Sequence, residues 1–167
     1  MNNNKIGFGG SCHWCTEAIF LSLKGVTNVQ QGWISSDAEN SGFSEAVIVE
    51  YDGELINLQT LIAIHLYTHS CTSNHSMRSK YRSAIYTFND TQKAIAADAI
   101  ASLQSGYDSP IITKILSYRE FRLNTEEFTN YYYSNPEKPF CENIVNPKLK
   151  LLLQQFASSV DADKLKH

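Results

Sequence analysis

Hydrophobic and polar positions along the chain form short blocks, and each block predicts a strand or a helix. The first apolar block, residues 5–10, is short and rich in glycine, which indicates a strand. Apolar residues at helical spacing begin at about His13 and continue to Gly25, a residue type that commonly follows the end of a helix. The chain is therefore predicted to open with a strand, a tight turn and a helix.

Two blocks rich in β-branched residues follow, and they predict neighbouring strands at residues 26–34 and 45–51. Asn57 comes next, placed to cap a helix that continues to Leu66. Residues 68–80 are polar and lack periodicity, so we expect a long loop. Loops of this length in compact domains are often functional.

The next part of the chain again predicts a strand, a helix and a strand, in that order. Residues 81–88 and 111–118 predict the two strands. Asn89 and Gln92 have the spacing of a capping box, and they predict the start of an alanine-rich helix that ends near Gly106.

The C-terminal part begins with an aromatic-rich stretch, residues 125–145, for which we expect one or two helical turns and then a surface loop. Asn146 and Pro147 are residue types favoured at the N-cap and at the first position of a helix, so they predict a last helix. We expect residues 161–167 to fray.

The predicted order of elements is β-α-β-β-α-β with an additional helix and strand. This order favours an α+β fold: a two-layer α/β sandwich of ferredoxin-like (split βαβ) topology with a mixed, mainly antiparallel sheet. A chain of 167 residues is long enough for one well-buried core, so we expect a single domain over residues 1–160 and a tail over 161–167.

Composition narrows the class of protein. Hydrophobic residues make up 43% of the chain and charged residues 19%, and the net charge of −3 lacks the basic excess typical of nucleic-acid binding. Neither a signal-peptide pattern nor an apolar run of about 18 residues is present. We therefore expect a cytoplasmic monomer with no nucleic-acid partner and no membrane association.

Four cysteines, Cys12, Cys15, Cys71 and Cys141, are too few and too unevenly spaced for a disulfide scaffold. A free thiol with a pKa of about 8.5 is only about 3% ionised at neutral pH. The predicted start of the first helix places Cys12 where unsatisfied N–H groups favour an anion, whereas Cys15 lies a turn further in. Cys12 is thus the better candidate for a nucleophile.

The Cys-x-x-Cys spacing is compatible with several kinds of site. Cys12 and Cys15 could form a thioredoxin-type dithiol. They could also bind zinc with further ligands from Cys71, His65 and His69. A third interpretation is a single thiol nucleophile with a distant resolving cysteine, and a fourth is that the thiols are simply buried. Spacing alone leaves these alternatives open.

Four stretches taken together resemble the peptide methionine sulfoxide reductase A family, whose members reduce the S epimer of methionine sulfoxide. They are "GFGGSCHWCTEAIF", "GFSEAVIVEYD", "KYRSAIY" and "NPEKPFCENIVNPKLK". The resemblance extends in order over residues 5–156. It implies a split-βαβ α+β sandwich, in agreement with the order of elements.

The resemblance implies a role for each matching residue. Cys12 would be the nucleophile that attacks the sulfoxide sulfur and becomes a sulfenic acid. Glu45 would be the acid that protonates the sulfoxide oxygen, and Tyr81 would hydrogen-bond to that oxygen. Trp14 would form one wall of the pocket for the substrate methyl group.

Regeneration requires a second thiol, and the resemblance points to Cys141 as the resolving cysteine. Cys15 and Cys71 are the alternative resolving thiols. Thioredoxin or another dithiol would then open the disulfide, so the resemblance implies no bound cofactor and no metal.

The chain departs from the family pattern at three positions of the substrate pocket. His13 stands in place of phenylalanine, Trp33 in place of a tyrosine whose hydroxyl would assist at the sulfoxide oxygen, and Ser76 in place of an aspartate. Because the loop around Ser76 is shortened, His69, Asn74 and His75 are candidate substitutes for the lost groups. The competing hypotheses are a dithiol-disulfide oxidoreductase that uses Cys12 with Cys15, and a catalytically inactive relative that binds oxidised methionine segments or zinc.

Overall fold

A computed structural model provides the structure of the chain, and it describes residues 3–10, 13–69, 71–73, 80–124 and 146–161. Two predicted features lie outside the described residues. They are the helical turns expected after Thr125 and the C-terminal tail from residue 162 on. Within the described ranges, every helix is too short or too polar to cross a membrane.

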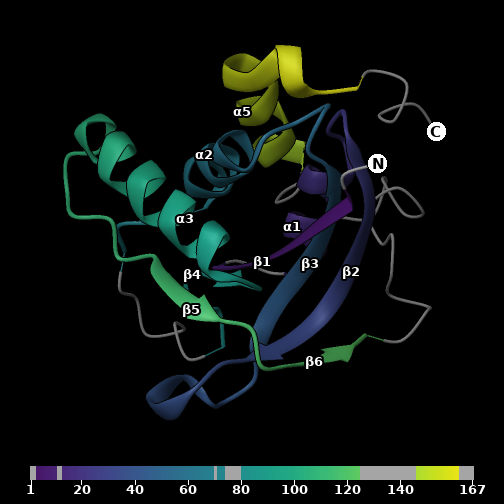
Figure 1. Ribbon diagram of the computed structural model, residues 1–167. Coiled ribbons are helices and arrows are strands. Elements are labelled where there is room, and N and C mark those ends of the chain that lie inside the picture. Colours follow the sequence, from purple (N-terminus) through teal and green to yellow (C-terminus); the bar gives the residue numbers. More distant parts are fainter. Residues whose placement is uncertain (1–2, 11–12, 70, 74–79, 125–145, 162–167) are drawn as a thin grey trace.

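A six-stranded sheet forms the centre of the described structure, with the strand order β5-β4-β1-β3-β2-β6 (Figure 1). Only the pair β4 and β5 is parallel, and the other neighbouring strands are antiparallel. The strands are β1 (Asn3–Gly9), β2 (Val26–Ser35), β3 (Ser44–Asp52), β4 (Ala84–Thr87), β5 (Lys114–Ser117) and β6 (Glu120–Leu123).

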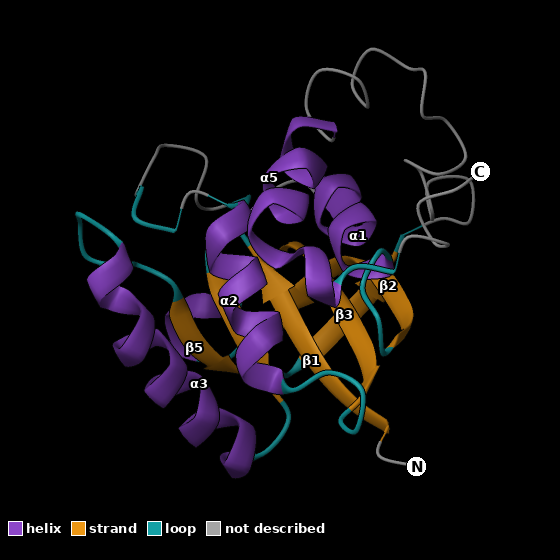
Figure 2. Ribbon diagram, turned by 90° about the horizontal axis from the view of Figure 1, so that it is seen from above, coloured by secondary structure: helices purple, strands orange, loops and turns teal. Residues whose placement is uncertain are grey.

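Helices gather over one side of the sheet, as the view from above shows (Figure 2). They are α1 (His13–Leu21), α2 (Leu58–Thr68), α3 (Asp90–Leu103) and α5 (Asn146–Phe156), with short 3-10 turns η1 (Ala38–Asn40), η2 (Gln104–Gly106) and η5 (Ala157–Ser159). The main core lies between these helices and the sheet, and it includes the fully buried side chains of Phe8, Phe20 and Leu61. Burial of such apolar surface is the main driving force for this layered packing.

The four central strands belong to two βαβ units that are interleaved in the sheet. Strand β3 lies between the two strands of the unit β1-α1-β2, and β1 lies between the two strands of the unit β3-α2-β4. The predicted α+β class with a mainly antiparallel sheet is confirmed. One consequence is that the ends of β1, β3 and β4 meet in one region, because Gly9 pairs with both Ala46 and Ala84.

Asparagine caps define the starts of two helices as the sequence predicts. The side-chain oxygen of Asn57 accepts a hydrogen bond of 2.8 Å from the backbone N–H of Thr60. Asn89 accepts one of 2.9 Å from Gln92, whose own side chain accepts from the N–H of Phe88. These bonds satisfy N–H groups that a helix leaves without an internal partner.

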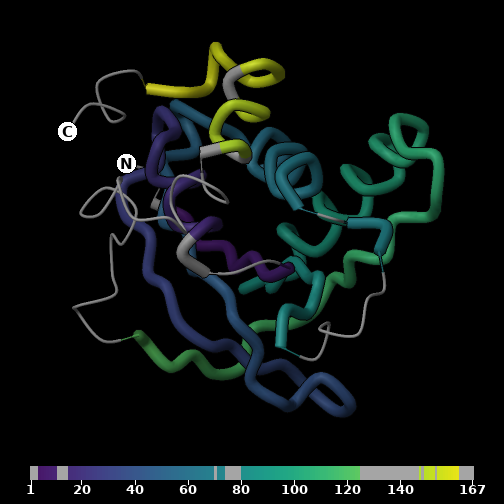
Figure 3. The backbone as a smooth tube through the Cα atoms, turned by 180° about the vertical axis from the view of Figure 1, so that it is seen from behind, coloured from purple at the N-terminus to yellow at the C-terminus, as the bar shows by residue number. Residues whose placement is uncertain are grey.

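Three sheet predictions need correction. The strand expected at residues 111–118 covers only Lys114–Ser117, because the backbone N–H of Ile112 bonds to the carbonyl oxygen of Cys71 instead. The strand expected at residues 81–88 covers only Ala84–Thr87, because the backbone just before it bonds to the start of β3 instead. Strand β6 (Glu120–Leu123) was not predicted; it forms by pairing with β2, along whose outer side it lies in Figure 3.

Candidate functional site

The turn between β1 and α1 is the place where the sequence puts the nucleophile. Strand β1 ends at Gly9 and helix α1 begins at His13, so Cys12 immediately precedes the helix. Cys12 itself lies outside the described residues, as do Ser76, Cys141, Asn74 and His75 and the side chains of His13 and Trp14. The described part of the site consists of the residues that surround this turn.

Gly10 brings the chain close to the end of α2. Its φ of +143° belongs to a region that L side chains rarely adopt, and a Cβ at this position would lie 2.5 Å from Cδ2 of His69. Glycine is therefore required here both for the backbone conformation and for the close approach.

Two stacked histidines at the end of α2 hold the end of β1. The ring of His65 lies 4.2 Å from that of His69 and 4.6 Å from that of Phe8, and its Nε2–H donates a bond of 2.8 Å to the carbonyl oxygen of Gly9. His65 is 2% exposed, so this carbonyl is satisfied inside the protein rather than by bulk water.

His69 extends this contact to the strand on the other side. Its Nδ1–H donates to the carbonyl oxygen of His65, and its Nε2 accepts a bond of 2.8 Å from the hydroxyl of Ser83. The Ser83 hydroxyl is in turn 2.8 Å from that of Thr113. A carbonyl oxygen can only accept a hydrogen bond, so Nδ1 of His69 carries the proton and Nε2 is the acceptor. Both ring nitrogens of His69 thus bond to other residues of the fold. This weighs against the predicted role of His69 as a substitute for a lost substrate contact.

The segment before β4 is tied to the start of β3. The carbonyl oxygen of Lys80 accepts bonds from the backbone N–H of Glu45 at 2.9 Å and from the hydroxyl of Ser44 at 2.8 Å. The same hydroxyl accepts a bond of 2.7 Å from the N–H of Arg82. Tyr81, between these two residues, is thereby held next to Glu45.

Glu45, Lys80 and Tyr81, which we call the β3 cluster, bring opposite charges together. The Glu45 side chain is 7% exposed, and its Oε2 lies 3.5 Å from Nζ of Lys80. That nitrogen also lies 5.2 Å from the centre of the Tyr81 ring. The Tyr81 hydroxyl and, to a smaller extent, the Glu45 carboxylate raise the pKa of Lys80. Lys80 therefore keeps its positive charge throughout the physiological pH range.

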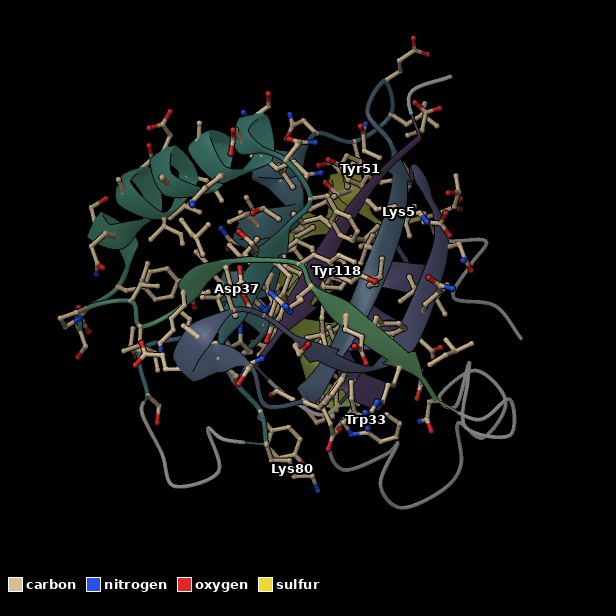
Figure 4. The ribbon with its side chains drawn as sticks, turned by 60° about the horizontal axis from the view of Figure 1, so that its bottom comes forward. Lys5, Trp33, Asp37, Tyr51, Lys80 and Tyr118 are labelled. Atoms are coloured by element: carbon tan, nitrogen blue, oxygen red, sulfur yellow. The ribbon has the colours of Figure 1, made fainter. Side chains whose placement is uncertain are left out.

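Trp33 faces this cluster from the neighbouring strand. It is the register partner of Glu45 in the β2–β3 pair, and Figure 4 shows Trp33 and Lys80 at the same end of the molecule. An indole ring has one N–H donor and no hydroxyl. The structure thus places Glu45, Tyr81 and Trp33, three of the predicted site residues, at the same end of the sheet.

Lys80 is the member of the cluster that the sequence analysis did not select. The available signal was its place directly before Tyr81 in "KYRSAIY", where the family motif has glutamine. Only the register of the loop against β3 shows that this side chain reaches the carboxylate of Glu45.

The two alternative resolving thiols lie in the main core. Cys15, on α1, is 1% exposed and Cys71 is 2% exposed. Burial and the neighbouring Cys71 thiol together raise the pKa of Tyr107 to about 12. Thiols buried in this way usually have a structural role.

The described residues contain no group of three histidine, cysteine or acidic side chains arranged to hold a metal ion.

Comparison with known proteins gives consistent matches. The sequence model of the peptide methionine sulfoxide reductase family matches residues 4–160. The peptide methionine sulfoxide reductase MsrA of Trichodesmium erythraeum is 31% identical over 173 residues, which covers 94% of this chain and 98% of that protein. The MsrA of Pasteurella multocida is 33% identical over 155 residues, which covers 84% of this chain and 89% of that protein.

Solved structures share the fold at lower identity. Mxr1 from Saccharomyces cerevisiae in its reduced form has a TM-score of 0.75 and 20% identity, covering 83% of this chain and 89% of its own. Mxr1 in complex with Trx2 has a TM-score of 0.62 and 20% identity, covering 75% of this chain and 82% of its own. Methionine sulfoxide reductase A of Corynebacterium diphtheriae has a TM-score of 0.67 and 22% identity, covering 81% and 76%.

Proposed function

This chain belongs to the peptide methionine sulfoxide reductase family, and from this premise we propose that it reduces methionine S-sulfoxide, free or in proteins, to methionine. The observation that carries the proposal is the family match over residues 4–160. The β3 cluster supports it, because a buried carboxyl group and a tyrosine lie together at the end of the sheet where β1 leads into Cys12.

In the first step the thiolate of Cys12 attacks the sulfoxide sulfur. The sulfoxide oxygen leaves its sulfur only when its developing negative charge is neutralised, so Glu45 serves as the source of a proton and Tyr81 as a hydrogen-bond donor. Trp14 and His13 line the pocket for the substrate, with Trp33 and Ser76 as further contacts. Methionine departs and Cys12 retains the oxygen as a sulfenic acid.

In the second step the thiol of Cys141 attacks this sulfenic acid, a disulfide forms and water leaves. The burial of Cys15 and Cys71 in the core supports Cys141 as the resolving thiol, because a buried thiol has poor access to a reaction partner. A thioredoxin-like dithiol then reduces the disulfide. The solved complex of Mxr1 with Trx2 supports this choice of reductant.

The proposed reaction uses thiols, side-chain proton and hydrogen-bond donors and the substrate, and it requires no bound cofactor and no metal. Oxidised proteins or free methionine sulfoxide are its substrates and a thioredoxin-like protein is its partner. The cytoplasmic location, the monomeric state and the single domain over residues 1–160 stay predictions.

Separate incubation with the S and R epimers of a methionine sulfoxide peptide tests this function, with dithiothreitol as the reductant. We expect the wild-type protein to release methionine from the S epimer only, and Cys12→Ser to release none. Chromatography of the product measures both outcomes. Absence of turnover of the S epimer by the wild-type protein would show that the proposed function is wrong.

A further inference from the structure

The β3 cluster contains a cation that the proposed reaction has not yet used. Nζ of Lys80 lies 3.5 Å from Oε2 of Glu45, close to the group from which the sulfoxide oxygen is to receive a proton. An ammonium group this close to the carboxyl group is a second proton donor at the same place. The proton that the reaction needs can therefore come from Lys80.

Arg82, the other cation among the described residues of this segment, makes its contacts elsewhere. The guanidinium group of Arg82 donates to the hydroxyl of Tyr86 at 2.9 Å and to the carbonyl oxygens of Gly42 and Ile34 at 3.1 and 3.2 Å. The Lys80 side chain, by contrast, is 55% exposed and carries its ammonium group on a flexible stem. It can therefore turn toward a ligand that lies beside Glu45 and Tyr81.

The need for an additional donor also follows from position 33. A tryptophan stands here opposite Glu45, so no hydroxyl is available from this position on β2. An ammonium group has three donors, and a charged donor forms a stronger bond to a developing oxyanion than a neutral hydroxyl does.

We propose that Lys80 is a catalytic residue of this chain, whose ammonium group hydrogen-bonds to the sulfoxide oxygen and gives it the proton. The inference rests on the proposed function, and it refines the role of Glu45 to that of a carboxylate that holds the ammonium group in place. It deepens the assignment of the site without changing the reaction.

The step balances with groups of the chain, the substrate and water. As the thiolate sulfur of Cys12 forms its bond to the substrate sulfur, the S–O bond loses its double-bond character and the oxygen takes one proton from Lys80. Lys80 becomes a neutral amine beside the Glu45 carboxylate. The amine then regains a proton from water, and its raised pKa favours this recharging before the next turnover.

The experiment is a single turnover of the S epimer by the reduced protein without added reductant, measured as the rate of methionine release. The variants are Lys80→Met and Lys80→Gln, the latter restoring the residue of the family motif. The matched control is Lys5→Met, because Nζ of Lys5 lies 4.0 Å from Glu50, another glutamate of β3. Thermal unfolding of each variant checks that it is folded.

We expect both Lys80 variants to release methionine roughly a hundredfold more slowly than the wild type near neutral pH. We expect Lys5→Met to stay within about threefold of the wild-type rate, as is usual for an exposed ion pair outside the site. The deficit should appear in the rate at saturating substrate and not in the substrate concentration that gives half of that rate, because the proton is needed in the transition state and not for binding.

Two outcomes contradict this inference while leaving the proposed function intact. In the first, the wild type is active and Lys80→Met and Lys80→Gln release methionine at its rate. In the second, the variants differ from the wild type only in the substrate concentration that gives half of the maximal rate, which would mean that Lys80 helps to bind the substrate and does not act on the sulfoxide oxygen. Failure of the wild type to release methionine from the S epimer would instead overturn the proposed function and this inference with it.

Discussion

Position 10 requires glycine because the neighbouring ring of His69 leaves no room for a side chain there. Replacing Gly10 with alanine puts a Cβ 2.5 Å from Cδ2 of His69 at a φ of +143°. We expect Gly10→Ala to lower the free energy of unfolding by about 1–3 kcal/mol and to slow turnover, because the shifted turn leads directly into Cys12. Urea unfolding and the S-epimer assay measure the two effects.

The matched control for Gly10→Ala is Gly42→Ala. A Cβ on Gly42 meets no atom within 4 Å, and its φ is not among the positive values. This substitution should leave the free energy of unfolding within about 0.5 kcal/mol of wild type. Equal stability of the two variants would contradict the steric argument.

The resolving thiol can be identified by substituting one cysteine at a time. We expect Cys141→Ser to release about one equivalent of methionine per chain and then stop when thioredoxin is the reductant, because its sulfenic acid has no resolving thiol. Cys15→Ser should continue to turn over, since Cys15 is 1% exposed in the core. The opposite result, with Cys15 essential and Cys141 dispensable, would support the dithiol-disulfide oxidoreductase.

Among secondary-structure elements, β6 depends most clearly on contacts distant in sequence. Gly32 of β2 pairs with Leu123, and a Cβ on Gly32 would collide with the carbonyl oxygen of Arg122. The strand forms because β2 offers an edge without side-chain bulk at this point. The local sequence "EFRL" contains no pattern that predicts this strand.

Gly32→Ala tests this account of β6. The new methyl group cannot fit without displacing the β6 backbone, so we expect the free energy of unfolding to fall by roughly 1–3 kcal/mol. Urea unfolding measures this change, and amide hydrogen exchange at residues 120–123 should rise more than at β1. Unchanged protection of β6 would show that the pair tolerates the methyl group.

The helix caps illustrate what local chemistry predicts well. Asn57 and Asn89 were predicted as N-caps, and their side chains make those bonds, because an N-cap depends on residues only three positions away. The strand before α3 was predicted too long, since residues 80–82 bond to the start of β3, which is distant in sequence.

For the molecule as a whole, the proposed chemistry requires thiols and a dithiol but no metal. We expect treatment with EDTA to leave both the thermal unfolding midpoint and the S-epimer turnover unchanged. Metal analysis of the purified protein should find well below one zinc ion per chain. Stoichiometric zinc, lost together with stability on chelation, would support the zinc-binding hypothesis instead.

The amino-acid sequence by itself determined the α+β class and the family, because periodic apolar blocks and caps are local signals and the four matching stretches are contiguous. It also selected Glu45, Tyr81 and Trp33, which the structure brings to one end of the sheet. Only the tertiary structure decided the presence of β6, the extent of β4, the burial of Cys15 and Cys71, and the contact of Lys80 with Glu45. Each of these depends on strand register or packing between residues far apart in the chain, and such contacts leave no periodic trace in the sequence.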